Sequence, residues 1–266
     1  MPTLLNRIAY KADLILKHWV DRARDRWYRR PFASFGPVEA LLFGRQIDFW
    51  CRAARVLDRL RPAVPPGGTI LDVGSGRDGL RTIVRLAGLE GRWRIVSSDL
   101  RPGRLRGGIA ASATALPFAD GSVDAAVAMD MLEHVPAPDR ARVIAELRRV
   151  ARRRVVLTLP VRDGDGRFDG LEPDRRFHLW HLRTRGYAEG NTAEHLSGAY
   201  PRLEELTAHG PSRLEPLCGN RAWTAYMRLA HRPLLWLGAG LFYWLRGRAA
   251  DRLPPHHSCL VEWRRP

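Results

Sequence analysis

The sequence contains little lysine and little cysteine, and both shortages limit what the chain can be. Lys11 and Lys17 are its only lysines, so arginine supplies nearly all of the 44 basic residues. The three cysteines are isolated and form no C-x-x-C pair (Cys51, Cys218, Cys259). This pattern indicates neither a zinc site nor a disulfide framework, and we expect no bound metal. It is typical of a protein from a reducing compartment.

The sequence also lacks an apolar run of the ~20 residues that cross a bilayer. The most apolar stretch, residues 234–245, is uncharged and lies between Arg232 and Arg246. With the basic, amphipathic residues 1–30, the segment 233–246 could lie in a membrane interface. Packing on the domain or a homodimer contact would explain both stretches equally well. Charges throughout the first thirty residues argue against a secretory signal, so we expect a cytoplasmic protein, with the inner face of the membrane as an open alternative.

The charge is strongly basic, with a formal net charge of +16 over 266 residues. Such an excess is one sign of a nucleic-acid-binding protein. The arginines are spread along the whole chain, however, and the bias against lysine is equally typical of a GC-rich genome. We therefore expect a small-molecule or lipid substrate rather than a nucleic acid.

Residues 70–79, ILDVGSGRDG, are the most informative stretch of the chain. They predict a buried strand that ends in a glycine turn and opens a helix, which exposes backbone amides to a ligand. A second predicted strand ends twenty residues later in Asp99, where a carboxylate can hold a ribose diol. The spacing of Gly74, Gly76 and Gly79 fits a dinucleotide fingerprint as well as a nucleoside-sulfonium site.

Asp72 favours the second of these ligands. A carboxylate at the mouth of the turn repels a pyrophosphate and attracts an ammonium group by about 4 kcal/mol at ~4 Å, most of which desolvation offsets. A short-chain dehydrogenase would also need a Tyr-x-x-x-Lys pair, and neither lysine follows a tyrosine at that spacing. The sequence therefore favours a methionine-type cofactor.

A block further along the chain resembles a known family. Residues 116–124 read LPFADGSVD, and residues 132–136 read LEHVP. Together with the glycine turn and Asp99, they resemble the class I S-adenosylmethionine-dependent methyltransferases, in the branch that acts on small molecules and lipids. The resemblance covers about residues 67–160.

The resemblance implies S-adenosyl-L-methionine as cofactor and a set of residues that hold it. Gly74 and Gly76 would let the backbone approach the methionine end, Asp72 would orient its ammonium, and Asp99 would accept both ribose hydroxyls. The predicted cofactor residues are Asp72, Gly74, Ser75, Gly76, Gly79, Asp99, Leu100, Ser112, Ala113 and Asp130. The family usually has an aspartate near Ser112 for the adenine amino group, and here Ser-Ala-Thr replaces it.

Alternating strands and helices predict an α/β fold with a doubly wound, mostly parallel seven-stranded sheet. We place a helical extension at residues 1–66 and the methyltransferase domain at 67–266. The domain would contain a polar insertion at about 161–200 and a helical insertion at about 221–250. The strands are expected at about 69–73, 93–98, 109–111, 123–128, 153–159, 213–219 and 258–264.

The expected chemistry is methyl transfer to a hydroxyl of a small molecule, lipid or lipid-linked glycan. His134 is the predicted general base because it follows the fourth strand, and Glu133 would orient it or contact the substrate. The polar insertion would close over the cleft and also carries His178, His181 and His195, any of which could be the base. His256 and His257 are expected to be tail residues. An RNA methyltransferase and a non-catalytic scaffold with the same fold are the alternatives.

Overall fold

The structure is a computed structural model, and most of the N-terminal region lies outside the residues that it describes. The described residues are 12, 13, 15, 16, 18–20, 22, 23, 47–76, 79–101, 108–188, 190–232, 235–247 and 252–265. The described residues between 12 and 23 are helical, as expected for the helical extension, and the other residues up to 46 lie outside this set. The same extension contains helix α3, Ile47–Leu60.

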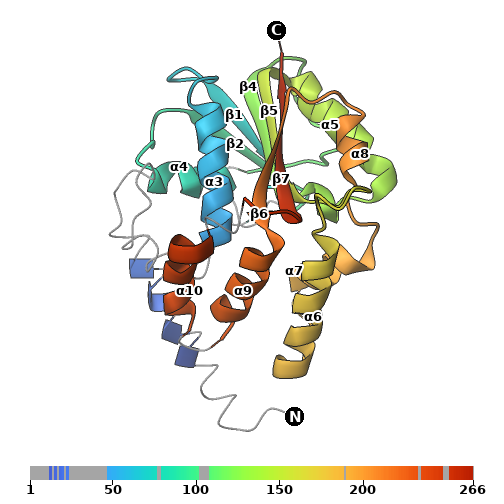
Figure 1. The fold of residues 1–266 in the computed structure, drawn as a ribbon. Helices are drawn as coiled ribbons and strands as arrows, with labels where there is room; N and C mark the ends of the chain where they lie inside the picture. The colour runs from blue at the N-terminus through green and yellow to red at the C-terminus, as the bar shows by residue number, and fades with distance from the viewer. Residues whose placement is uncertain are drawn as a thin grey trace.

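Seven strands form one sheet, which confirms the predicted fold class (Figure 1). The strands are β1 Thr69–Val73, β2 Arg94–Asp99, β3 Ile109–Ala110, β4 Val123–Met129, β5 Ala151–Pro160, β6 Arg213–Gly219 and β7 His256–Arg264. Their order is β3-β2-β1-β4-β5-β7-β6, with β1 to β5 parallel and β7 antiparallel to both of its neighbours. The order reverses between β1 and β4, and ligands of such sheets bind beside that point, beyond the carboxyl ends of the strands.

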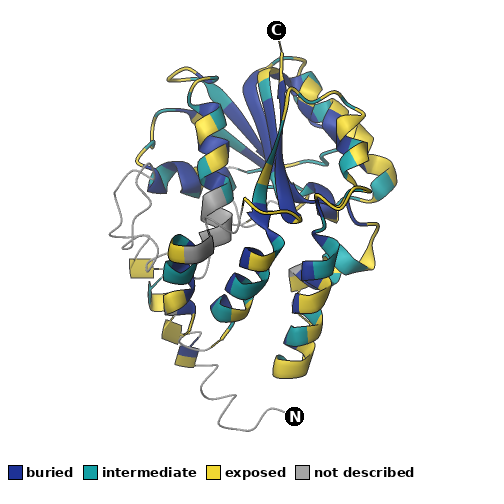
Figure 2. Ribbon diagram, viewed as in Figure 1, coloured by how far each residue is buried: buried dark blue, intermediate teal, exposed yellow. Residues whose placement is uncertain are grey.

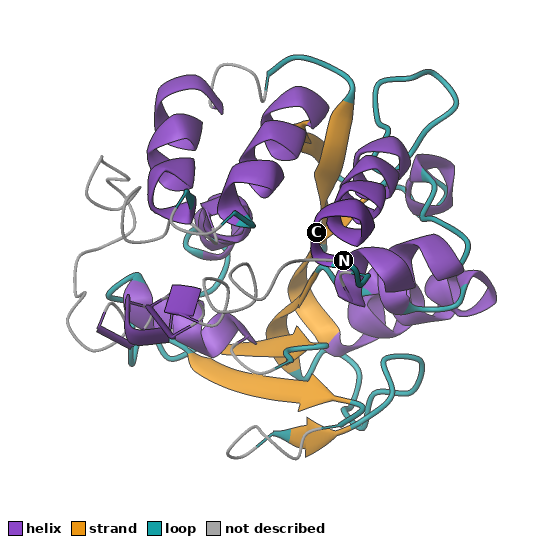
Figure 3. Cartoon of the chain, turned by 90° about the horizontal axis from the view of Figure 1, so that it is seen from below, coloured by secondary structure: helices purple, strands orange, loops and turns teal. Residues whose placement is uncertain are grey.

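Helices cover both faces of the sheet because successive side chains of each central strand point to opposite sides. Ile70 packs in one core with α3 and α4, Gly79–Leu86. Leu71 and Val73 pack in the other core with α5, Ala137–Val150, and with Leu206 of α8, Leu203–Thr207. The strands are therefore buried on both sides, as the dark blue centre of Figure 2 shows. Seen from below, helices lie on both sides of the sheet (Figure 3).

Further helices lie at the carboxyl ends of the parallel strands, in the lower half of Figure 1. They are α6 Leu171–Arg185, α7 Gly190–Ser197, α9 Asn220–Ala230, α10 Trp236–Phe242 and the π-helical turn η2 Tyr243–Gly247. The polar insertion thus supplies α6 and α7, and the second insertion supplies α9, α10 and η2. The domain division itself stays a prediction. Residues of α3, which we assigned to the extension, pack in the core with β1.

The apolar segment near residue 240 packs largely inside the protein. Ala239 and Tyr243 form a buried cluster with Tyr226 of α9. The buried Trp236 donates its indole N–H to Asp13 of the N-terminal helix at 2.7 Å. None of the helices in the described part of the chain combines the length and the apolar character that a bilayer crossing requires.

Candidate active site

A pocket of about 310 Å³ opens at the switch point of the sheet. Its wall combines the turn after β1, the end of β2, the loop after β3 and the segment from η1, Leu132–His134, to α5. The lining residues are Val73, Gly74, Asp99, Leu100, Ala111, Ser112, Ala113, Thr114, Met131, His134, Val135, Pro136, Asp139 and Val143. The pocket is therefore largely apolar, and its titratable groups are the carboxylates of Asp99 and Asp139 and the imidazole of His134.

The glycine turn needs its glycines for two reasons. Gly74 has a φ of +69°, which favours glycine, and a Cβ there would collide with the side chain of Met131. A Cβ on Gly79 would collide with a carboxylate oxygen of Asp72. The turn therefore brings bare backbone to the pocket wall at one glycine and makes room for a buried carboxylate at the other.

Asp99 lies at the pocket wall and also supports the turn. One of its carboxylate oxygens accepts the amide N–H of Gly76 at 3.1 Å, and the other accepts that of Arg101 at 2.9 Å. Each carboxylate oxygen has a second lone-pair direction, so a diol can still donate to both. The Asp99 carboxylate can therefore accept hydrogen bonds from the free ribose hydroxyls of a nucleoside cofactor.

Part of the predicted cofactor set lines the pocket, and the rest does not. Gly74, Asp99, Leu100, Ser112 and Ala113 line the pocket, whereas Asp72, Ser75, Gly76, Gly79 and Asp130 are outside the lining set. Of this second group, Asp130 follows β4 and pairs with Arg52 of α3 at 2.7 Å. Its backbone is left-handed, with a φ of +49°.

Asp72 is buried, and it accepts the amide N–H of Leu80 at the start of α4 at 2.7 Å. Burial raises the pKa of Asp72 from 3.8 to about 6. Because the folded pKa is above the unfolded one, the native protein holds a proton between these values, and this contribution to stability is lost as pH rises through 6.

We expect the free energy of unfolding of the wild type, measured relative to Asp72→Asn, to fall by about 1.4 kcal/mol between pH 5 and pH 8. The variant keeps the side-chain oxygen that caps α4 and loses the titration. If a cofactor ammonium lies beside Asp72, saturation with S-adenosylhomocysteine will weaken this pH dependence, because a positive charge favours the carboxylate. Urea unfolding at both pH values measures the effect, and equal curves for both proteins would contradict it.

A second group of polar side chains lies beside the pocket and centres on Asp174 of α6, which is buried. Its carboxylate contacts His195 Nδ1 of α7 at 2.8 Å, His257 Nε2 of β7 at 3.0 Å and the hydroxyl of Tyr200 at 3.0 Å. Burial opposes its ionisation, but the charges and hydrogen bonds of His257 and His195 hold the pKa of Asp174 well below its usual value. Burial, and next the charge of Asp174, raises the pKa of Tyr200 well above 10.0.

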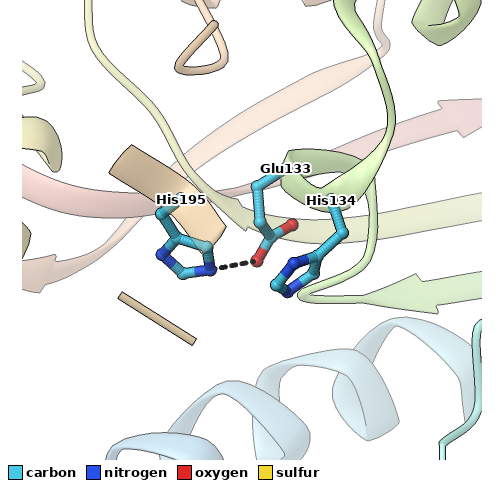
Figure 4. Close-up of side chains that lie close together, drawn as sticks. All are labelled: Glu133, His134 and His195. Atoms are coloured by element: carbon cyan, nitrogen blue, oxygen red, sulfur yellow. Dashed lines mark ion pairs between the residues drawn. The ribbon is translucent and has the colours of Figure 1, made fainter. Parts of the chain in front are cut away.

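The two predicted catalytic residues reach this group from η1. His195 Nε2 lies 3.9 Å from a carboxylate oxygen of Glu133, and the rings of His195 and His134 are 5.0 Å apart (Figure 4). Glu194 of α7 holds His134 Nδ1 at 3.0 Å, in the place that we had predicted for Glu133. Burial, then the charge of Asp130, raises the pKa of Glu133 well above 4.5. Burial, then the charge of His195, lowers the pKa of His134.

The structure corrects the expectation for the last two histidines. His256 and His257 are buried on β7 rather than in a tail, and the ring of His257 stacks on Trp223 at 4.2 Å. Asp174 was missed, because an aspartate inside an arginine-rich polar insertion carries no local sign of burial. His181, an alternative base, instead contacts the carbonyl of Tyr187 at 2.9 Å.

Comparison with known proteins gives the class of the domain. Residues 71–159 match the family described as "Methyltransferase domain". An uncharacterized methyltransferase of Mycobacterium sp. (strain JLS) is 40% identical over 98 residues, which are 33% of this chain and 38% of that protein. The same values hold for a relative from Mycobacterium sp. (strain KMS). The chain thus matches less than half the length of these curated relatives. The similarity to methyltransferases therefore covers residues 71–159 of this chain.

Solved structures share the fold of this chain at low sequence identity. A geranyl diphosphate methyltransferase in complex with S-adenosylmethionine has a TM-score of 0.52 and 18% identity, over 82% of this chain and 85% of that one. Geranyl diphosphate C-methyltransferase from Streptomyces coelicolor A3(2) has a TM-score of 0.50 and 16% identity, over 81% and 78%. Phosphoethanolamine N-methyltransferase 2 from Haemonchus contortus has a TM-score of 0.50 and 16% identity, over 88% and 58%.

Proposed function

We propose that this protein transfers a methyl group from S-adenosylmethionine to a hydroxyl of a small-molecule or lipid acceptor. The observation that carries the proposal is a single pocket with Gly74 and Asp99 on one part of its wall and His134 on another. The first part has the features that a nucleoside cofactor needs, and the second offers an imidazole to the acceptor. The match to the methyltransferase family over residues 71–159 supports the same reaction.

The chain's own contribution is positioning and proton transfer. S-adenosylmethionine supplies an electrophilic methyl group, whose bond to sulfur breaks as the bond to the acceptor oxygen forms. The protein fixes the two reactants in line, which can supply about 7–11 kcal/mol. His134, whose lowered pKa keeps its imidazole neutral at pH 7, accepts the proton that the acceptor hydroxyl loses. Glu194 holds its Nδ1 and so fixes the ring.

We propose further that the acceptor is apolar, such as a lipid. Most of the pocket wall is apolar, and the N-terminal helix and the segment after α10 carry exposed apolar side chains. Ile15 and Trp19 of the N-terminal helix are 60% and 65% exposed, and Leu245 beyond α10 is 60% exposed. Contact with a membrane surface through these residues would give the enzyme access to such an acceptor.

Binding of S-adenosylhomocysteine tests the proposal without knowledge of the acceptor. We expect calorimetric titration of the full-length protein to give one site per chain and a raised melting temperature. S-adenosylhomocysteine should compete with S-adenosylmethionine, and NAD should give no heat, since Asp72 near the turn disfavours a pyrophosphate. Failure to bind either sulfur compound would sink the proposal and leave a scaffold with a methyltransferase fold.

A further inference from the structure

The carboxylate of Glu133 is buried and accepts no hydrogen bond from another described residue, and its one ion-pair contact is His195 Nε2 at 3.9 Å. Its residue is 6% exposed, and neither carboxylate oxygen has a hydrogen-bond partner from another residue in the described part of the chain. Burial of an unpaired carboxylate is strongly unfavourable, so such a group is either protonated or paired with a cation. Among the described residues no arginine forms an ion pair with Glu133; Arg52, whose charge acts on Glu133, forms its ion pair with Asp130 at 2.7 Å.

Two imidazoles stand beside this carboxylate. One nitrogen of His134, one nitrogen of His195 and one oxygen of Glu133 all lie within 4.8 Å of one another. Figure 4 shows Glu133 and His134 extending from the same turn toward His195, which comes from α7. Two imidazoles and a carboxylate form a ligand set that divalent transition metals favour, and three protein ligands leave positions open for a substrate.

The surroundings of the histidines have the form expected around metal ligands. Histidine ligands usually donate their second ring N–H to a carboxylate, which fixes the tautomer and the ring. Asp174 contacts His195 Nδ1 at 2.8 Å, while Nε2 of the same ring faces Glu133. Glu194 contacts His134 at 3.0 Å from the solvent side. The chain as a whole has a net charge of +16, yet the carboxylates of Glu133, Asp174 and Glu194 surround the two imidazoles. This local negative charge favours the binding of a cation.

We propose that Glu133, His134 and His195 bind a divalent transition-metal cation, such as Mn²⁺ or Zn²⁺, at the acceptor end of the pocket. Ligand atoms ~2.1 Å from a tetrahedral ion are ~3.4 Å apart, so the side chains need to close by little more than 1 Å. The expectation of no metal, drawn from the isolated cysteines, does not extend to this histidine and carboxylate set.

The consequence for catalysis rests on the proposed function. His134 lines the pocket, so an ion held by it would lie beside the acceptor hydroxyl. The cation would supply Lewis acidity that lowers the pKa of that hydroxyl, and His134 would then be a ligand instead of the proton acceptor. The hydroxyl proton would pass to solvent, the oxygen lone pair would form the new bond to carbon, and the electrons of the broken bond would remain on sulfur.

Direct metal binding tests the site. Untagged full-length protein is freed of metal with a chelator and titrated with Mn²⁺, Co²⁺ and Zn²⁺, by calorimetry and by the visible absorption of bound Co²⁺. We expect one equivalent per chain and a higher melting temperature with metal. Glu133→Gln and His195→Gln should each weaken binding by more than about 100-fold. His209→Gln, outside the cluster, is the control and should bind like the wild type.

Glu133→Gln replaces a buried carboxylate that accepts no hydrogen bond and should fold at least as well as the wild type in chelator, so loss of its metal binding is not a folding defect. Wild-type protein that binds no metal, or Glu133→Gln protein that binds it equally well, overturns the inference.

Titration with S-adenosylhomocysteine in chelator separates the two proposals. Cofactor binding without metal binding leaves the proposed function standing, and the reverse leaves only the metal site.

Discussion

Asp174→Asn is expected to destabilise the protein by about 3–5 kcal/mol, the range for removing one partner from a buried charged group. Asp174 accepts from His195, His257 and Tyr200 at once. An asparagine of the same shape has one oxygen only, so its amide N–H₂ faces an imidazole or hydroxyl that also donates. The buried donors that Asp174 now accepts from are then left without a charged acceptor.

Thermal and urea unfolding measure this effect, which should lower the melting temperature by roughly 10 °C in a chain of this size. Tyr200→Phe removes a single hydrogen bond and should change the free energy of unfolding by only about 1 kcal/mol. Asp165→Asn, on the exposed part of the polar insertion, is the matched control and should leave stability unchanged. A wild-type melting temperature for Asp174→Asn would mean that Asp174 does not hold this group of side chains together.

Asp174→Asn also tests the proposed metal site, because Asp174 contacts one of its three ligands, His195. Asp174 contacts Nδ1 of His195, and Nε2 of the same ring faces Glu133. If a metal binds there, loss of this outer carboxylate should weaken its affinity by about 10–100-fold. The stability effect is expected with or without metal, so the two measurements are independent.

The sheet could be predicted from the sequence because its signals are local. Buried parallel strands appear as short apolar runs, such as residues 123–128, and the described β4 extends one residue further. The glycine turn and Asp99 follow their strands directly, so the carboxyl edge of the sheet could be predicted with them. The helical character of 171–185 was missed, because arginine and histidine on all sides of α6 leave a weak apolar periodicity.

The polar cluster could not be predicted in the same way. Four separate elements bring these residues together: Glu133 lies on η1, Asp174 on α6, His195 on α7 and His257 on β7. A histidine or aspartate in a polar segment looks the same in sequence whether it is solvated or buried. Only the chain path shows that the antiparallel β7 returns His257 to the end of the sheet where His134 lies. Glu133 was predicted to orient His134 or to contact the substrate, and the carboxylate that contacts His134 Nδ1 is that of Glu194.

Asp99→Ala is expected to weaken binding of S-adenosylhomocysteine by about 100-fold or more. Hydrogen bonds to a charged group contribute about 1.5–3 kcal/mol each, and two ribose hydroxyls can donate to this carboxylate. Calorimetric titration measures the loss. Asp120→Ala is the control, because Asp120 is 78% exposed in its pair with Arg149 and lies outside the pocket wall.

Asp99 also accepts the amide N–H of Gly76, so the alanine variant could weaken binding by loosening the glycine turn. A cofactor analogue without the ribose hydroxyls separates the two causes. If Asp99 binds the diol, the wild type will bind this analogue as weakly as Asp99→Ala does, and the variant will lose nothing further. If the turn is the cause, the variant will bind both compounds more weakly than the wild type by the same factor. That second outcome would make Asp99 a support of the backbone amides and remove it from the direct contacts of the cofactor.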